Sequence, residues 1–133
     1  EKEKGIRKIL NFGHTFAHAY EATLGYSKKL NHGEAVILGI ISALKFSLNT
    51  RLISIKEYET ITRHIKKIKL PSNIKTHFSI KDLNRILYFM MKDKKNVSKK
   101  INLILLKKIG LTSINNHYDY LKIKRFLKKE LAN

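Results

Sequence analysis

The stretch from Arg7 to Tyr20, RKILNFGHTFAHAY, constrains this chain more than any other. Drawn as an α-helix at about 100° per residue, it places four polar side chains in one narrow arc, namely Arg7, Asn11, His14 and His18. The opposite arc, about 140° to 260° from Arg7, is apolar and holds Ile9, Phe12, Gly13, Phe16 and Tyr20. A solvated helix face usually carries Lys and Glu, so this polar row suits an anionic ligand, a metal ion or both. On spacing alone, an amphipathic helix with hydrogen-bonded histidines explains the pattern equally well.

A third histidine follows at the start of a second helical pattern. Gly25 and Tyr26 form a stop-and-turn signal. The sequence LNHGEAV, residues 30–36, then places His32 directly before an apolar run. A histidine at this point can fold back against the first helix.

Two motifs of this region resemble the C-terminal domain of the 3-dehydroquinate synthase family. They are LNFGHTFAHAYE, residues 10–21, and GY…NHGEAV, residues 25–36. The lead-in E-x-G-x-R at residues 3–7 is similar to a family pattern, as is MKDKK at 91–95 followed by INLILLKKIG at 101–110. The resemblance covers residues 1 to about 110. Its two histidine motifs, taken together at this separation, are specific.

The resemblance implies roles for the three histidines. His14 and His32 correspond to the family's metal ligands, which a glutamate from an N-terminal domain completes. His18 corresponds to a catalytic histidine in the proton-transfer network near the substrate phosphate. Glu34 either supports His32 as a hydrogen-bond acceptor or stabilises the start of its helix, and we favour the second role.

The resemblance also implies substrate-binding residues. Arg7 and Asn11 correspond to an arginine and an asparagine that bind substrate, and Glu3 would orient Arg7. The DKK motif supplies one substrate-binding lysine, Lys94 in preference to Lys95. The glycine that usually follows this motif is missing here, so the turn after it departs from the family pattern.

The activity implied is that of a lyase of the shikimate pathway for aromatic amino acids. The intact protein would convert 3-deoxy-D-arabino-heptulosonate 7-phosphate into 3-dehydroquinate and phosphate. Its cofactors would be a divalent metal, zinc or alternatively cobalt, and NAD.

The sequence contains no G-x-G-x-x-G motif, and the family binds NAD through an N-terminal domain that is absent from this chain. We therefore expect residues 1–133 to be one helical metal- and substrate-binding domain, a fragment that is inactive alone. The expected location is the cytoplasm, and the expected partners are the missing N-terminal domain and a second copy in a homodimer.

The net charge of +18 raises another class, a basic helical nucleic-acid-binding module. However, 23 of the 28 cations are lysines spread along the chain, whereas phosphate and base recognition relies more on arginine. Lys, Ile and Asn make up 51 of the 133 residues, as drift in an AT-biased genome would produce. We favour solvated lysines over a general attraction for an anionic substrate, and disfavour nucleic acid. The sequence is also compatible with a related sugar-phosphate cyclase and with a decaying remnant that has no role.

The remaining patterns predict a mainly α domain with one small β-hairpin. Helices are expected over residues 5–24, 33–49, 54–68, 79–90 and 119–131, with S-x-x-E and S-x-x-D caps at Ser54 and Ser79. Residues 101–106 predict a strand and residues 111–114 a short partner. No apolar run reaches 18 residues, so no membrane span is expected.

Several packing roles follow from the same patterns. Gly39 and Ala43, four residues apart, would allow a close helix neighbour. Tyr88 and Phe89 at helical spacing predict core positions. The inward side of the third helix is predicted to be Ile61, Ile65 and Ile68, and that of the last helix Leu121, Phe126, Leu127 and Leu131. The remaining histidines, His64, His77 and His117, are predicted to lie at the surface.

Overall fold

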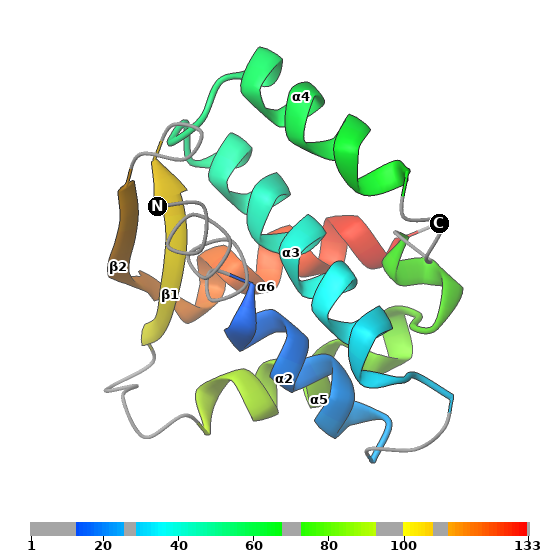
Figure 1. Ribbon diagram of the computed structural model, residues 1–133. Helices are drawn as coiled ribbons and strands as arrows, with labels where there is room; N and C mark the ends of the chain where they lie inside the picture. The colour runs from blue at the N-terminus through cyan, green and yellow to red at the C-terminus, as the bar shows by residue number, and fades with distance from the viewer. Residues whose placement is uncertain (1–12, 26–28, 68–72, 93–99, 108–111, 133) are drawn as a thin grey trace.

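The computed structural model describes residues 13–25, 29–67, 73–92, 100–107 and 112–132 (Figure 1). The elements in chain order are α2 (His14–Thr23), α3 (His32–Asn49), α4 (Ile55–Lys66), the 3-10 turns η1 (Ile74–Thr76) and η2 (Ile80–Asp82), α5 (Leu83–Met91), β1 (Lys100–Lys107), β2 (Thr112–Asp119) and α6 (Tyr120–Leu131). The prediction of a mainly α domain with one hairpin is therefore confirmed. In these ranges no helix is both long enough and apolar enough to span a membrane.

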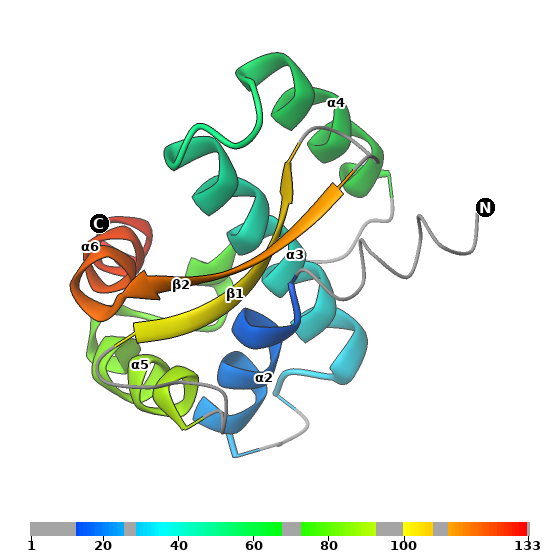
Figure 2. The same ribbon diagram turned by 90° about the vertical axis from the view of Figure 1, so that its left-hand side faces the viewer.

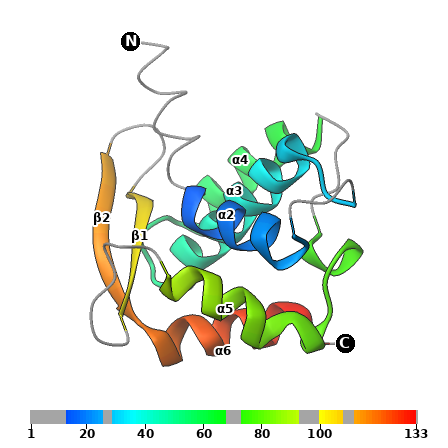
Figure 3. The same ribbon diagram turned by 90° about the horizontal axis from the view of Figure 1, so that it is seen from below.

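Helix α3 lies at the centre of the domain because it is apolar nearly all round. Its buried residues extend from Ala35 to Ser47. It contacts α2, α4 and β1, and Figure 2 shows the hairpin lying across these helices. Helix α2 runs beside α3 in the opposite direction (Figure 1) and also contacts α5 (Figure 3).

Two glycines allow α2 and α3 to approach backbone to backbone. A Cβ atom on Gly39 would lie 2.5 Å from the carbonyl oxygen of Gly13 and 2.8 Å from the Cβ of Ala17. A Cβ atom on Gly13 would lie 2.6 Å from the backbone nitrogen of Ile40. Neither position has room for a side chain. The predicted close approach at Gly39 is confirmed, and the neighbour is α2.

The apolar face of α2 anchors that helix in the core, as predicted for Phe16 and Tyr20, which are both 0% exposed. The ring of Phe16 lies 6.1 Å from that of Phe126, and the ring of Tyr20 lies 5.2 Å from that of Phe78. The buried Tyr20 hydroxyl is hydrogen-bonded to the Ser42 hydroxyl. Burial raises the pKa of Tyr20 well above its ordinary range because phenolate cannot be solvated there.

The predicted inward face of α6 is confirmed at three positions and wrong at Leu121. Leu121 is 64% exposed, whereas Ile123 is fully buried. Phe126, Leu127 and Leu131 are buried, as predicted. The three confirmed positions and Ile123 share one arc, and Leu121 falls about 160° away from Ile123 at 100° per residue.

The core prediction for α5 is likewise wrong at Tyr88, which is 53% exposed, and Phe89 is only partly buried. The core face of α5 is instead formed by Leu83, Ile86, Leu87 and Met90. Tyr88 falls about 150° from the middle of that face. The backbone N–H of Ser79 donates to Asp82 over 2.9 Å at the start of this segment, so Ser79 and Asp82 do open it, through η2.

Helix α4 is a surface helix with the predicted start. Ser54 and Glu57 exchange two hydrogen bonds across the first turn. Ile61 and Ile65 are partly buried against the core rather than enclosed in it. Ile68 lies outside the described residues.

The hairpin is longer than predicted on its second strand. Strands β1 and β2 are antiparallel, with Lys100 opposite Asp119 and Lys107 opposite Thr112. The sequence pattern ended this strand at residue 114 because the Asn-Asn-His that follows has weak strand preference. Pairing with the apolar β1 extends β2 to Asp119, the residue directly before α6.

Candidate functional site

A pocket of about 250 Å³ lies between the open face of α2 and the start of α3. It is lined by Gly13, His14, Ala17, His18, Glu21, His32 and Val36. The three predicted histidines thus lie in one pocket, which the sequence explains in two steps. Residues 14, 18 and 21 share one face of α2 because they are spaced by four and three. Helix α3 runs antiparallel to α2 (Figure 1) and begins at His32, and His32 lines the pocket together with that face.

His14 and His18 lie side by side along the open face of α2. Their ring centroids are 4.6 Å apart, with the ring planes tilted by 41°. Both residues are exposed, whereas Phe16 and Tyr20 on the opposite face are fully buried. The core therefore fixes the helix, and the helix presents two imidazoles side by side to the pocket.

His32 is held from across the pocket by Glu21. Its Nδ1 lies 3.2 Å from Oε2 and 3.3 Å from Oε1 of that carboxylate. The Glu21 side chain is 14% exposed and that of His32 is 78% exposed. Sequence reasoning did not select Glu21 as a site residue. The available signal was its place three residues after His18 and seven after His14, on the same helical face.

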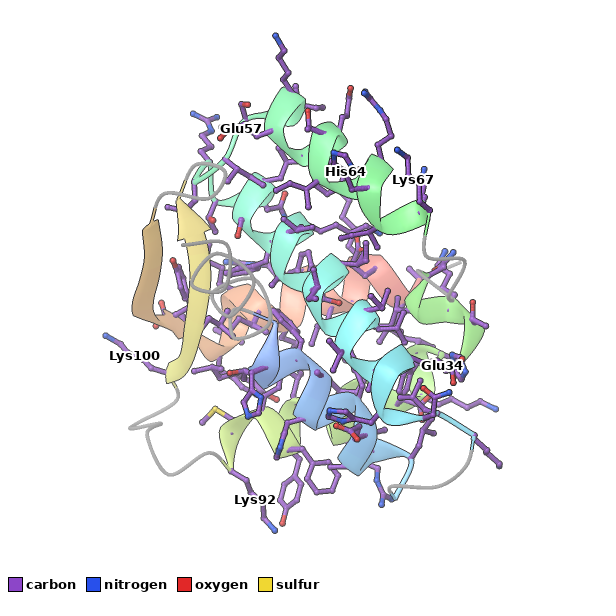
Figure 4. The ribbon with its side chains drawn as sticks, in the orientation of Figure 1. Glu34, Glu57, His64, Lys67, Lys92 and Lys100 are labelled. Atoms are coloured by element: carbon purple, nitrogen blue, oxygen red, sulfur yellow. The ribbon has the colours of Figure 1, made fainter. Side chains whose placement is uncertain are left out.

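Glu34 has the role that we favoured for it. Its backbone N–H donates to Asn31 Oδ1 over 2.8 Å, and its Oε1 accepts from the Asn31 N–H over 3.1 Å. Figure 4 shows Glu34 at the start of α3. The carboxylate thus stabilises the helix start, and the support for His32 comes from Glu21.

Both predicted metal ligands, His14 and His32, lie among the described residues, but a complete metal site needs more than two ligands. Within the described ranges, no group of three or more His, Asp or Glu side chains could hold a metal ion. Catalytic zinc usually takes three protein ligands. If His14 and His32 were two of them, the site would still need a further ligand.

The predicted substrate-binding residues lie outside the described residues. They are Arg7, Asn11, Lys94 and Glu3, together with Lys95 as the second choice of lysine. Their roles stay predictions.

The other histidines differ in burial. His64 is exposed near the end of α4, as predicted (Figure 4). His77 is half-buried, contrary to the prediction, and its Nδ1 is buried with no hydrogen-bond partner among the described residues. His117 lies in β2.

The model of the 3-dehydroquinate synthase C-terminal family matches residues 1–96. This chain belongs to that family. The 3-dehydroquinate synthase of Pelagibacter ubique (strain HTCC1062) is 59% identical over 132 residues, which are 99% of this chain and 36% of that protein. That of Rhodopseudomonas palustris (strain TIE-1) is 33% identical over 137 residues, again 99% and 36%. The chain therefore spans about a third of the length of these curated relatives.

Solved structures show the same fold. A 2-deoxy-scyllo-inosose synthase complexed with carbaglucose-6-phosphate, NAD+ and Co2+ superposes with a TM-score of 0.72 at 23% identity, covering 90% of this chain and 34% of that one. A second structure of a 2-deoxy-scyllo-inosose synthase gives a TM-score of 0.65 at 19% identity, covering 90% and 31%. The predicted dehydroquinate synthase-like fold is thus confirmed.

Proposed function

We propose that this chain supplies the metal- and substrate-binding helices of a 3-dehydroquinate synthase. The whole enzyme would convert 3-deoxy-D-arabino-heptulosonate 7-phosphate into 3-dehydroquinate and phosphate, as a lyase of the shikimate pathway. The observation that carries the proposal is the pocket shared by His14, His18 and His32. The 59% identity of this chain to the 3-dehydroquinate synthase of Pelagibacter ubique supports the proposal further. As the family resemblance implies, we expect the enzyme to act in the cytoplasm as a homodimer.

The donors in the pocket fit a divalent cation. His14 and His32 would hold it, because neutral imidazole nitrogens are common ligands of zinc and cobalt. The contact of His32 Nδ1 with Glu21 leaves Nε2 for the cation. Bound zinc or cobalt would supply Lewis-acid polarisation of substrate oxygens, and NAD, held outside this chain, would supply hydride transfer.

His18 would move a proton beside that cation. Its ring centroid lies 4.6 Å from that of His14, and His18 is exposed and lines the pocket. An exposed imidazole next to the substrate can take a proton on a ring nitrogen and return it later. Arg7 would bind the substrate carboxylate through two parallel hydrogen bonds, Asn11 would add another and Glu3 would orient Arg7. Lys94 would neutralise negative charge on the substrate.

A chimera tests this proposal. Residues 1–133 would replace the matching 132 residues of the Pelagibacter relative. The remaining 64% of that protein would be kept. With NAD and zinc or cobalt, we expect release of phosphate from the heptulosonate phosphate and formation of 3-dehydroquinate. His18→Ala should abolish turnover, and His64→Ala on the exposed α4 should not change it. We expect no turnover from the 133-residue chain alone.

The outcomes separate the possible functions. A folded, metal-loaded chimera that turns over no heptulosonate phosphate would contradict the proposed function. Turnover of glucose 6-phosphate instead would assign a related cyclase, the class of the structural neighbours. Turnover by the isolated 133-residue chain would show that our expectation of an inactive fragment is wrong.

A further inference from the structure

Glu21 is the acidic side chain among the residues that line the histidine pocket. It lies on α2, so the same rigid helix carries His14, His18 and this carboxylate. The backbone contact at Gly13 and Gly39 fixes that helix against α3, which carries His32. The carboxylate and the imidazole that meet across the pocket therefore belong to two helices in close backbone contact.

The contact dictates where the proton of a neutral His32 lies. Both Glu21 oxygens are within 3.3 Å of Nδ1, and an ionised carboxylate only accepts hydrogen bonds. Nδ1 must therefore carry the hydrogen. A neutral imidazole has one N–H, so the Nε2 of His32 keeps its lone pair.

We propose that Glu21 is a positioning residue that holds the His32 proton on Nδ1 and so presents Nε2 to a divalent cation. This inference rests on the proposed role of His32 as a metal ligand. It adds a residue to the site that the sequence pattern did not select.

The burial of the two partners supports this role. The His32 side chain is 78% exposed, so packing restrains its ring only weakly, whereas the Glu21 side chain is 14% exposed and held by its helix. Asn31 and Glu34 fix the backbone around His32 through their reciprocal hydrogen bonds. Glu21 then fixes the ring. An imidazole fixed in this way loses less freedom when it binds a cation.

The tautomer can be measured directly on the 133-residue chain without metal. Long-range proton–nitrogen NMR at mildly alkaline pH separates protonated from bare ring nitrogens. We expect His32 to have a protonated Nδ1 and a bare Nε2. Glu21→Ala should remove this preference, and Glu21→Gln should retain it because the amide oxygen still accepts the hydrogen bond. Glu34→Gln is the matched control: it removes the same charge two residues from His32, and it should leave the tautomer unchanged.

Metal affinity gives a second readout, measured by competition with a chromophoric chelator for Co2+ in the chimera. We expect Glu21→Ala to weaken binding about 10- to 100-fold, as is usual when an outer partner of a ligand is lost. Glu21→Gln should weaken it less, and Glu34→Gln should not change it. Circular dichroism of each variant confirms folding.

Three results would overturn the proposal. The first is a wild-type His32 protonated on Nε2. The second is unchanged Co2+ affinity in a folded Glu21→Ala variant. The third is an equal large loss in Glu21→Ala and Glu21→Gln with an altered Co2+ absorption spectrum, which would make Glu21 a direct ligand. An inactive chimera with the expected tautomer and affinities would instead contradict the proposed reaction alone.

Discussion

Helices α3 and α4 begin in the same way but lie in different environments. In α3 the Glu34 N–H donates to Asn31 over 2.8 Å, and in α4 the Glu57 N–H donates to Ser54 over 3.1 Å. Figure 4 shows both glutamates at these starts. Yet α3 is buried along most of its length, whereas α4 has no fully buried residue. The cap determines where a helix begins, and the distribution of apolar side chains determines where it packs.

The difference matters for function because each helix carries a histidine. His32 begins α3 and faces Glu21 on a packed neighbour. His64 lies near the end of α4 and is exposed. A ligand needs an element that holds it within a fraction of an ångström, and of these two helices α3 is the one with fully buried residues.

The largest expected effect comes from removing the imidazole of His32, compared with removing that of His64. In the chimera, His32→Ala should weaken Co2+ binding by more than about 100-fold, beyond the loss typical of an outer partner. His64→Ala should leave binding unchanged because His64 is not among the residues that line the pocket. Chelator competition measures both. Equal affinities of the two variants would show that the pocket is not the metal site.

The next effect tests the packing that holds α3. Gly39→Ala would place a Cβ 2.5 Å from the Gly13 carbonyl oxygen, so the helices must separate. We expect a loss of about 3 kcal/mol in the free energy of unfolding, measured by urea denaturation. Gly33→Ala is the control in the same helix, since its Cβ would meet only Asn31 Oδ1 at 3.5 Å. It should stabilise the chain by up to about 1 kcal/mol.

A smaller effect concerns the buried hydroxyl pair between α2 and α3. Tyr20→Phe leaves the Ser42 hydroxyl, which is buried, without this partner. The cost should be about 1–2 kcal/mol in urea denaturation, and adding Ser42→Ala should recover part of it. A double variant as unstable as the sum of the two single variants would contradict the pairing.

The same tyrosine predicts a pH dependence. Burial raises the pKa of Tyr20 in the folded chain, so the unfolded chain loses this proton first. The contribution of Tyr20 to the free energy of unfolding is complete below the ordinary tyrosine pKa of about 10. It declines as the pH rises above that value. The stability difference between wild type and Tyr20→Phe should therefore shrink above about pH 10. A constant difference would mean that the phenol is not desolvated.

Much of this site could be predicted because its signals are local. His14 and His18 share a face through their spacing on one helix, and the apolar run after His32 marks where α3 begins. Glu21 was missed because its contact joins two helices, and helical spacing does not specify which side chain meets which across a packed pair. The pattern could only suggest the nearer acid, Glu34.

The errors elsewhere have the same origin. Leu121 is apolar, but α6 packs against the core through the face that carries Ile123. Leu121 lies on the other side of the helix and is therefore exposed. Tyr88 was expected inside and lies outside for the same reason. Residues 115–117 became strand through pairing with β1 rather than through their own preference. Local periodicity determines whether a segment forms a helix or a strand. Tertiary contacts determine which of its residues face the core.

The smallest effect compares the two caps directly. Asn31→Ala and Ser54→Ala each remove one cap, and each should cost about 1 kcal/mol in urea denaturation. Only Asn31→Ala should also weaken Co2+ binding in the chimera, by a few-fold, because it loosens the backbone next to His32 while Glu21 still holds the ring. Ser54→Ala should leave the affinity unchanged. If both variants lose stability and neither loses affinity, the ring contact with Glu21 alone positions His32, and the cap serves only the helix.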